Sequence, residues 1–300
     1  MLLAAYNGAP WIRQQLESIL AQDAVDAHIT IRDDGSSDST LQEIAGLAAD
    51  DRRIEVTSPS PPTGSAAGNF FTLIGQYAAD GFDFVAFSDQ DDIWRRQKLA
   101  RACRLLRDSG AAAYSSATIA QWEDGRQRRV ALSGRQNACD FLFEGGGQGC
   151  TFVLSAAFYE RVRRFIAEHP ALLQGLHFHD WTVYALARAW GLRWAFDSTP
   201  AVVYRQHSGN DTGARGSFPG ARKRLALLRN GWYRGQLERI SLLCAAAAPD
   251  DARITAWCRT LAEPRGWKRT ARLVRFCLHW GRRRTRDRAV FTLACLAGWV

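Results

Sequence analysis

Apolar and polar positions along the first hundred residues predict strands and helices in turn. Four short apolar runs have the length and composition of buried strands: 2–6, 28–32, 53–57 and 83–88. Apolar residues at helical spacing predict four helices, one opening at Pro10, one from Leu41, and two over 69–79 and 94–107. Connections this short favour an α/β fold with a mostly parallel central sheet and right-handed crossovers. Ligands of such folds bind at the carboxyl ends of the strands.

The remainder of the chain is patterned less regularly. A helix is expected over 181–190, and strands are expected over 111–122, 151–155, 192–196 and 201–204. The segment GRQRRV at 125–130 is expected to form a hairpin or an edge segment. From Ala221 onward the pattern is helical. It predicts a long helix to Ala248, a break at the adjoining Pro-Asp-Asp, and two further helical segments.

Charge divides the chain into two parts. The net charge of the 300 residues is +9. Residues 215–300, called the basic tail below, hold 19 basic and 5 acidic residues, whereas residues 1–214 hold 20 basic and 25 acidic ones. The tail therefore carries +14 and the rest of the chain −5. We expect an acidic α/β domain over 1–214 and a basic, helical extension over 215–300.

The seven cysteines argue for a reducing compartment. They are odd in number and have no CxxC spacing, so neither a disulfide framework nor a zinc knuckle is expected. The N-terminus has no basic segment followed by a long apolar run, and no stretch reaches about 18 uninterrupted apolar residues. The sequence is most simply that of a cytoplasmic protein.

The segment SDQDDIW at 88–94 is the strongest chemical signal. Three carboxylates, Asp89, Asp91 and Asp92, follow directly on a predicted buried strand, where unpaired charge is costly. A divalent cation neutralises such a cluster, and carboxylate oxygens suit Mg²⁺ or Mn²⁺, which also bind diphosphates. The alternative is that these residues cap the next helix, but a cap needs only one of them.

A second signal is IRDDGSSDST at 31–40. Two aspartates after a strand, followed by glycine and small hydroxyl residues, can form a pocket for a nucleoside, and a carboxylate there can accept an N–H of the base. The same residues are also typical of an ordinary turn followed by a capped helix. The hypothesis of a nucleoside pocket becomes more specific because SDQDDIW lies at another strand of the same predicted sheet.

Together these segments resemble the family 2 glycosyltransferases, which use nucleotide sugars and have the GT-A fold. The resemblance runs through LLAAYNG, IRQQLESILAQ, RDDGSSDST, GNFFTL and FSDQDDIW with its Lys98, and continues more weakly through GQGC, FHDW and YRQHSGNDTGA. It covers roughly residues 2–214. FSDQDDIW, HDW and YRQH are most similar to bacterial rhamnosyltransferases of O-antigen and capsule assembly. The sequence departs from the family by starting almost inside the first strand and by having Ala5 where relatives have Thr or Ser.

The resemblance implies a role for each matching residue. Asp34 would meet the nucleotide base, with Ala4 and Tyr6 lining the same pocket. Asp89 and Asp91 would face the ribose and the metal, and Asp92 would complete the metal shell.

The resemblance also places Asp180 at the position of the catalytic base. A carboxylate at a helix start can deprotonate an acceptor hydroxyl as it attacks the anomeric carbon, with inversion. Without the resemblance, Asp180 is equally a helix N-cap.

Two further features are open to two readings each. His207 is of the type that adds an imidazole to a metal or touches a diphosphate, but a lone histidine is more often structural. EGGGQGC at 144–150 would let backbone approach a sugar acceptor, or would form a turn between strands.

The basic tail favours the surface of an anionic membrane. Basic, Trp- and Leu-rich amphipathic helices bind there, and each cation near the headgroups adds about 1 kcal/mol. A solvated helix face and nucleic-acid binding are the alternatives, and the acidic α/β domain argues against nucleic acid. The cations are Arg222, Lys223, Arg224, Arg229, Arg234, Arg265, Lys268, Arg269, Arg272, Arg275 and Arg282–Arg284, and the apolar residues between them are Leu225, Leu228, Trp232, Leu237, Ile240, Trp267, Leu273, Phe276, Leu278 and Trp280.

The sequence thus predicts an inverting, metal-dependent glycosyltransferase peripheral to the inner face of the cell membrane. Its partners would be a nucleotide-diphosphate sugar, dTDP-rhamnose by resemblance, and a lipid-linked saccharide acceptor, with no nucleic acid. The alternatives are a UDP-hexose-dependent transferase and a non-catalytic module that binds glycan or membrane. A sugar nucleotidyltransferase is disfavoured because AAYNGAPW lacks a Gly-rich loop with Arg or Lys after the first strand.

Overall fold

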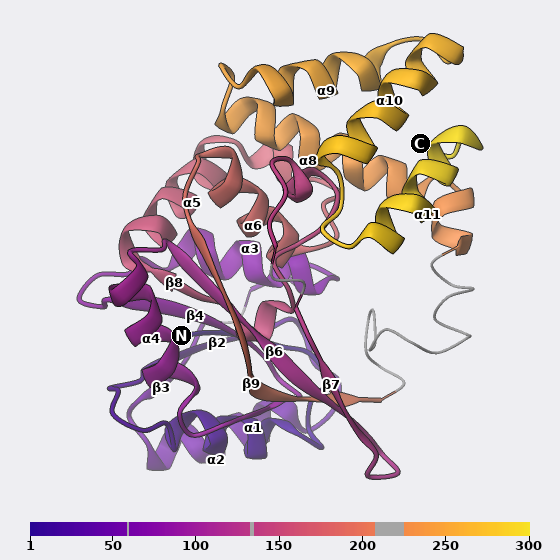
Figure 1. Ribbon diagram of the computed structural model, residues 1–300. Helices are drawn as coiled ribbons and strands as arrows, with labels where there is room; N and C mark the ends of the chain where they lie inside the picture. The colour runs from indigo at the N-terminus through magenta and orange to yellow at the C-terminus, as the bar shows by residue number, and fades with distance from the viewer. Residues whose placement is uncertain (59, 133–134, 208–224) are drawn as a thin grey trace.

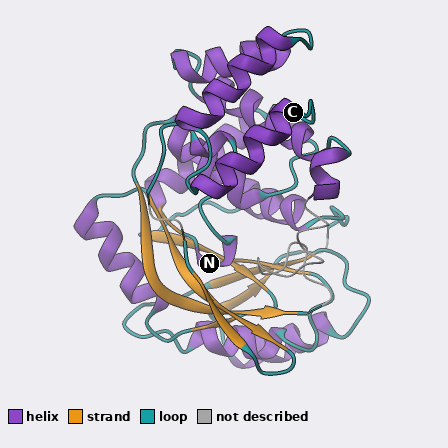
Figure 2. Ribbon diagram, turned by 45° about the vertical axis from the view of Figure 1, so that its right-hand side comes forward, coloured by secondary structure: helices purple, strands orange, loops and turns teal. Residues whose placement is uncertain are grey.

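A central sheet organises the part of the chain that the structure describes (Figures 1 and 2). The computed structural model describes residues 1–58, 60–132, 135–207 and 225–300. Within these residues nine strands lie in the order β3-β2-β1-β4-β8-β6-β9-β5, with β7 paired to β6. Their bounds are β1 Leu2–Ala5, β2 Ile29–Asp33, β3 Ile54–Val56, β4 Phe84–Asp89, β5 Ile93–Trp94, β6 Ala113–Trp122, β7 Gln127–Val130, β8 Val153–Ser155 and β9 Trp194–Gln206.

The first four strands form the parallel sheet that the sequence predicted. β1 pairs in parallel with β2 and with β4, and β2 pairs in parallel with β3. The register sets Ala5 opposite Asp33 and Ala4 opposite Asp89, so the carboxyl ends of three strands meet at one edge. Beyond β4 the sheet is mixed, because β8 runs antiparallel to β4 and β6 while β9 runs parallel to β6.

Helices cover both faces of the sheet, because alternate strand residues point to opposite sides. Leu3 and Ala5 of β1 belong to one apolar core, and Leu2 and Ala4 belong to another. The Leu3 face is covered by α1 Ile12–Leu20, α2 Thr40–Asp50 and α4 Lys98–Ser109, and the Leu2 face is covered by α3 Ala66–Gln76, α5 Ala156–Glu168 and α6 His179–Ala189.

Among the boundaries that differ from the prediction, two differ because of strand pairing. α4 begins at Lys98 instead of residue 94, because Ile93 and Trp94 pair with β9. The two short strands expected over 192–204 are one continuous strand, β9, which absorbs Pro200 through irregular pairing with β6.

The basic tail adds helices outside the Leu2 face, drawn orange to yellow in Figure 1. Its longer helices are α8 Trp232–Ala247, α9 Ala252–Ala262, α10 Trp267–Trp280 and α11 Thr285–Leu296. The long helix expected from Ala221 to Ala248 is interrupted, because Gly231 has a left-handed φ of 79° between the helical residues 225–229 and α8. Three helices come after the Pro-Asp-Asp break, where two segments were expected, since Pro264 and Gly266 separate α9 from α10.

The tail shares its apolar core with the α/β part of the chain. α8 packs against α6, and Leu237, Trp257 and Phe276 are buried in the same core as Leu2 and Phe70. Much of the apolar stripe predicted to meet a membrane is therefore internal: Leu237, Ile240, Leu273 and Phe276.

The prediction that the run Arg282–Arg284 faces a bilayer is wrong for its first two residues. Arg282 donates to the carbonyl of Phe143, and the Arg283 side chain is only 6% exposed in an ion pair with Asp140. A buried partner 143 residues away satisfies Arg283 in place of lipid headgroups. Arg222, Lys223 and Arg224 lie outside the described residues.

All seven cysteines lie among the described residues and are free thiols, six of them buried.

Candidate active site

Two loops at the carboxyl ends of β1 and β2 form one rim of the site. The N–H of Asn7 donates to Ser36 Oγ and that of Gly8 to Thr40 Oγ1, each at 2.8 Å. Tyr6 stands on this rim with 55% of its surface exposed, whereas Ala4 is buried in the strand below it. The structure thus brings the predicted nucleotide-pocket residues Ala4 and Tyr6 beside the segment 31–40.

Asp34 begins the loop after β2 and is almost fully buried. One carboxylate oxygen accepts from Arg32 and from the N–H of Thr63, and the other accepts from the Thr63 hydroxyl and the N–H of Gly64. Burial alone raises the pKa of Asp34, but these hydrogen bonds outweigh it and hold the pKa below its ordinary value. Asp34 therefore holds the loop around Thr63 against the carboxyl end of β2. An N–H of a nucleotide base would have to displace one of these donors to bind Asp34.

Asp89, Asp91 and Asp92 lie at the end of β4, beside the end of β1. Oδ1 of Asp91 and both carboxylate oxygens of Asp92 are buried with no hydrogen-bond partner among the described residues. Desolvation, followed by the charges of Asp91 and Asp180, raises the pKa of Asp89 to about 8. Burial and the charges of Asp91 and Asp89 likewise raise the pKa of Asp92. Burial and mutual repulsion thus disfavour the ionised forms of Asp89 and Asp92.

His207 follows β9 and completes one side of this cluster. Its Nε2 lies 2.9 Å from a carboxylate oxygen of Asp91. Trp11 stacks on the imidazole with ring centroids 4.0 Å apart, which fixes the direction of the ring. Arg205 donates to the backbone carbonyl of Asp91 at 3.0 Å. Of the predicted metal ligands, the structure thus brings Asp91 and His207 into direct contact.

Two buried residues near Asp92 were not singled out by the sequence as site residues. The ligand atoms of Asp89, Asp92 and Cys150 lie within 4.8 Å of one another. The Lys98 ammonium is buried over the Trp94 ring, and desolvation lowers the pKa of Lys98 to about 7 although Asp92 opposes the shift. Cys150 is the last residue of the glycine loop, and that position was the signal that could have drawn attention to it.

The ligand atoms of this cluster match the preferences of a divalent cation. Orphaned oxygens on Asp91 and Asp92, a carboxylate on Asp89 and an imidazole on His207 are hard or intermediate ligands that suit Mg²⁺ or Mn²⁺. A cation there would also stabilise the ionised forms of Asp89 and Asp92, which desolvation and neighbouring carboxylates disfavour. These residues therefore fit the metal.

Asp180 lies in the first turn of α6, one residue after the helix begins. The N-cap of α6 is Phe178, so the alternative reading of Asp180 as the N-cap is wrong. One carboxylate oxygen of Asp180 accepts from the N–H of Trp181, and its charge is close enough to raise the pKa of Asp89. The fold thus brings the predicted base to the edge where β4 ends, although some 90 residues separate the two in sequence.

The glycine loop at 144–150 lies flat against the start of α6. A Cβ added to Gly149 would come within 2.6 Å of His179 Nε2 and 3.2 Å of Asp180 Cβ. His179 itself is buried, with its ring stacked on Phe70 at 3.7 Å. Close packing against α6 therefore accounts for glycine at position 149.

Comparison with known proteins identifies relatives of the chain. The family model described as glycosyl transferase family 2 matches residues 2–164. The dTDP-rhamnosyl transferase RfbG of Shigella flexneri is 38% identical over 251 residues, which are 83% of this chain and 86% of that protein. The Escherichia coli protein WfgD, named as a UDP-Glc:alpha-D-GlcNAc-diphosphoundecaprenol beta-1,3-glucosyltransferase, is 31% identical over 106 residues, 35% of this chain and 40% of its own length.

Solved structures share the fold. TarS 1-349 of S. aureus, in complex with UDP-GlcNAc, aligns with a TM-score of 0.58 at 14% identity, over 93% of this chain and 80% of that one. The mannosyltransferase PcManGT of Pyrobaculum calidifontis, in complex with GDP-Man and Mn²⁺, aligns with a TM-score of 0.51 at 18% identity, over 98% and 83%. These likenesses confirm the expected GT-A architecture of a sheet between helices.

Proposed function

The chain belongs to glycosyltransferase family 2, and from that premise we propose that it transfers L-rhamnose from dTDP-rhamnose to a lipid-linked saccharide. Membership makes it a nucleotide-sugar glycosyltransferase, and its relatives point to polysaccharide synthesis. One observation carries the choice of donor, namely 38% identity to a dTDP-rhamnosyl transferase over 83% of the chain. The name of the E. coli relative supports an acceptor such as GlcNAc-diphosphoundecaprenol.

The donor is proposed to lie along the carboxyl edge of β1, β2 and β4. Its base would meet Tyr6, Ala4 and Asp34, and its ribose would meet Asp89. The exposed ring of Tyr6 supports this, since an aromatic face can stack on a base. Asp34 would also act by holding Thr63 and Gly64 over the base.

We assign a divalent cation, Mg²⁺ or Mn²⁺, to Asp91, Asp92 and His207. When bound, such a cation stabilises negative charge on a departing diphosphate. The support is the set of partnerless buried oxygens and the contact between His207 and Asp91. Trp11 and Arg205 keep these ligands oriented.

Asp180 is proposed as the base. Its carboxylate would accept the proton of the acceptor hydroxyl while that oxygen attacks the anomeric carbon from the face opposite the diphosphate, which inverts the carbon. The nearness of Asp180 to Asp89 supports this, because base and donor must meet at one place.

Association with the inner face of the cell membrane is proposed for the tail. None of the helices in the described ranges is long and apolar enough to cross a membrane. α10 and α11 nevertheless expose large apolar side chains beside exposed cations such as Lys268 and Arg275, a pattern suited to an anionic headgroup layer. The exposed apolar residues are Trp267, Leu278, Trp280, Val290, Leu293 and Leu296. We assign the transferase site to residues 1–214 and this contact to 215–300, with a boundary that falls outside the described residues.

A donor panel tests the reaction. Purified protein is given dTDP-rhamnose, UDP-glucose or UDP-galactose, with GlcNAc-diphosphoundecaprenol in detergent and Mg²⁺ or Mn²⁺. We expect dTDP release and one added deoxyhexose only with the first donor. Product from UDP-glucose alone would favour the UDP-hexose alternative, which the name of the E. coli relative supports.

An Asp180→Asn variant separates catalysis from binding. We expect turnover to fall about 100-fold or more while the affinity for dTDP is kept. Asp108→Asn, a change to an exposed carboxylate on α4, is the control and should leave turnover unchanged. If well-folded wild-type protein cleaves none of the three donors, the hypothesis that remains is a non-catalytic module that binds glycan or membrane.

A further inference from the structure

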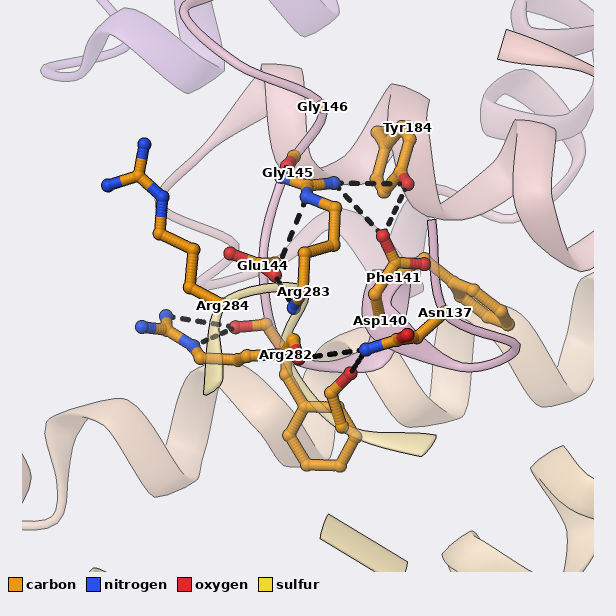
Figure 3. Close-up of polar contacts among 12 residues, drawn as sticks. Asn137, Asp140, Phe141, Glu144, Gly145, Gly146, Tyr184, Arg282, Arg283 and Arg284 are labelled. Atoms are coloured by element: carbon orange, nitrogen blue, oxygen red, sulfur yellow. Dashed lines mark hydrogen bonds and ion pairs between the residues drawn. The ribbon is translucent and has the colours of Figure 1, made fainter. Parts of the chain in front are cut away.

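Arg283 of the basic tail is inserted into the α/β part of the chain (Figure 3). It lies in the turn between α10 and α11, and its side chain is 6% exposed. Its guanidinium donates to the carboxylate of Asp140 at 3.0 Å, to the Tyr184 hydroxyl at 3.1 Å and to the Gly145 carbonyl at 2.6 Å. Its backbone N–H donates to the Glu144 carboxylate. One side chain of the tail thus joins α6 to the glycine loop.

The turn that carries Arg283 is itself held from both sides. The side-chain amide of Asn137 donates to the carbonyls of Gly281 and Arg282, each at 2.9 Å. The Arg282 guanidinium donates to the Phe143 carbonyl at 3.1 Å and to the Tyr233 hydroxyl of α8 at 2.8 Å. Because these partners are distant in sequence, the position of Arg283 depends on the folded tail.

On α6 the contacts fall on the side that carries Asp180. Tyr184 and Arg188 follow Asp180 by four and eight residues, so the three share one side of the helix. Tyr184 donates to Asp140 at 2.7 Å and Arg188 donates to the same carboxylate at 3.0 Å. Asp140 is fully buried, and Arg283 supplies its second cation. This shared carboxylate fixes the rotation of α6 about its axis.

On the glycine loop, Arg283 contacts Glu144 and Gly145, which come shortly before Gly149, the residue that packs against Asp180. A Cβ on Gly145 would lie 3.3 Å from Trp181 Cα, and one on Gly149 would lie 3.2 Å from Asp180 Cβ. The loop therefore rests directly on the first turn of α6. A shift of the Gly145 carbonyl would remove the support under Asp180.

We propose that Arg283 is a positioning residue for the acceptor half of the reaction, holding α6 and the glycine loop together so that Asp180 meets the acceptor hydroxyl. The proposal rests on the proposed role of Asp180 as the base. Among the described residues, the hydrogen bonds of Arg283 go to η1 Asp140–Leu142, the glycine loop and α6, and none goes to the donor edge at Asp34, Asp89 or Asp91. The tail thereby contributes to the chemistry of the site as well as to any contact with a membrane.

Steady-state kinetics of Arg283→Gln test this, with dTDP-rhamnose and GlcNAc-diphosphoundecaprenol as probes. Loss of the guanidinium fork should lower kcat about 10- to 100-fold, because small misplacements of a catalytic group are costly. KM for the donor and the affinity for dTDP should stay within about twofold. Arg283→Lys keeps the charge without the planar fork, so its kcat should lie between that of the wild type and that of Arg283→Gln. Arg286→Gln removes an exposed cation three residues away and should behave like the wild type.

The outcomes are distinguishable. A kcat of Arg283→Gln within about twofold of the wild type would overturn the proposal, and so would a parallel loss of dTDP affinity and kcat, which marks a general structural role. If the melting curve shows that Arg283→Gln is unfolded, the same criteria apply to Arg283→Lys. Asp180→Asn is assayed alongside. If that variant keeps its turnover, the proposed base fails; if it is inactive while Arg283→Gln is normal, only the inference about Arg283 fails.

Discussion

The imidazole of His207 lies 2.9 Å from the carboxylate of Asp91, although 116 residues separate them in the chain. Asp91 follows β4 and His207 follows β9, so the sheet brings them together. Trp11, at the start of α1, stacks on the imidazole and keeps Nε2 directed at the carboxylate. An imidazole and a carboxylate held in this way can share a divalent cation, since both ligands are oriented before it binds.

Removal of either partner should weaken metal binding. We expect Asp91→Asn and His207→Ala each to lower the affinity for Mn²⁺ about 10-fold or more, measured by calorimetry with dTDP present. His28→Ala changes an exposed histidine at the opposite end of the sheet and should bind Mn²⁺ normally. Unaltered affinity in both site variants would refute the assignment of Asp91 and His207 as ligands.

The glycine at position 149 should be required for turnover. A methyl group there would lie 2.6 Å from His179 Nε2 and 3.2 Å from Asp180 Cβ, so Gly149→Ala must displace the buried His179 ring, and we expect Asp180 to move with it. We expect kcat to fall about 10-fold or more with little change in donor KM.

Gly75→Ala is the matched control for that variant. Gly75 lies in α3, and a Cβ there has no neighbour within 4 Å, so alanine should be tolerated and should slightly raise the melting temperature. Equal kcat in the two alanine variants would contradict the role given to the loop.

Stability should decline as the pH falls below 6.5, in part because of His179. Burial lowers the pKa of His179 to about 3 from an ordinary value of 6.5. Between these values the unfolded chain binds a proton and the folded chain does not, so acidification favours unfolding. From pH 7 to pH 5 this linkage removes about 2 kcal/mol of unfolding free energy.

Urea melts of His179→Gln at the two pH values isolate this contribution. The variant loses the stacking on Phe70, so we expect a lower unfolding free energy at both pH values. Its unfolding free energy should, however, fall by about 2 kcal/mol less between pH 7 and pH 5 than that of the wild type. Equal pH dependence in both proteins would show that His179 is not the source.

Membrane binding should depend on the exposed apolar residues of the tail. Deleting residues 221–300 would expose the shared core, so point changes are the sounder test. The triple variant Trp267→Ser, Leu293→Ser, Leu296→Ser should co-sediment less with vesicles containing phosphatidylglycerol. Leu41→Ser with Phe82→Ser, two exposed residues of the α/β part, is the control. If wild type, triple variant and control sediment equally, the tail does not bind the bilayer.

Much of the fold could be predicted from local patterns. Strand and helix periods repeat in the first hundred residues, and parallel strands end at one edge, so Asp34 and Asp89 were expected at the same edge of the sheet. Their closeness along that edge depends on the strand order, in which only β1 lies between β2 and β4. The triple carboxylate at 89–92 was recognisable because charge at the end of a buried strand needs a partner. Boundaries were less predictable. The apolar spacing over 94–107 is helical throughout, but pairing with β9 places Ile93 and Trp94 in a strand.

Local sequence patterns were sufficient to predict the parallel strands, the carboxylates at their ends and a basic tail of amphipathic helices. Tertiary structure alone decided what those helices cover and where their arginines lie. An amphipathic pattern specifies that a face will be buried without specifying its partner, so a membrane and the α/β domain were equally compatible with it. The buried carboxylate of Asp140 distinguishes them, because a desolvated charge requires fixed cations close by. Arg188 of α6 and Arg283 of the basic tail are those cations. They are far apart in the sequence, and only the folded chain brings both of them to Asp140.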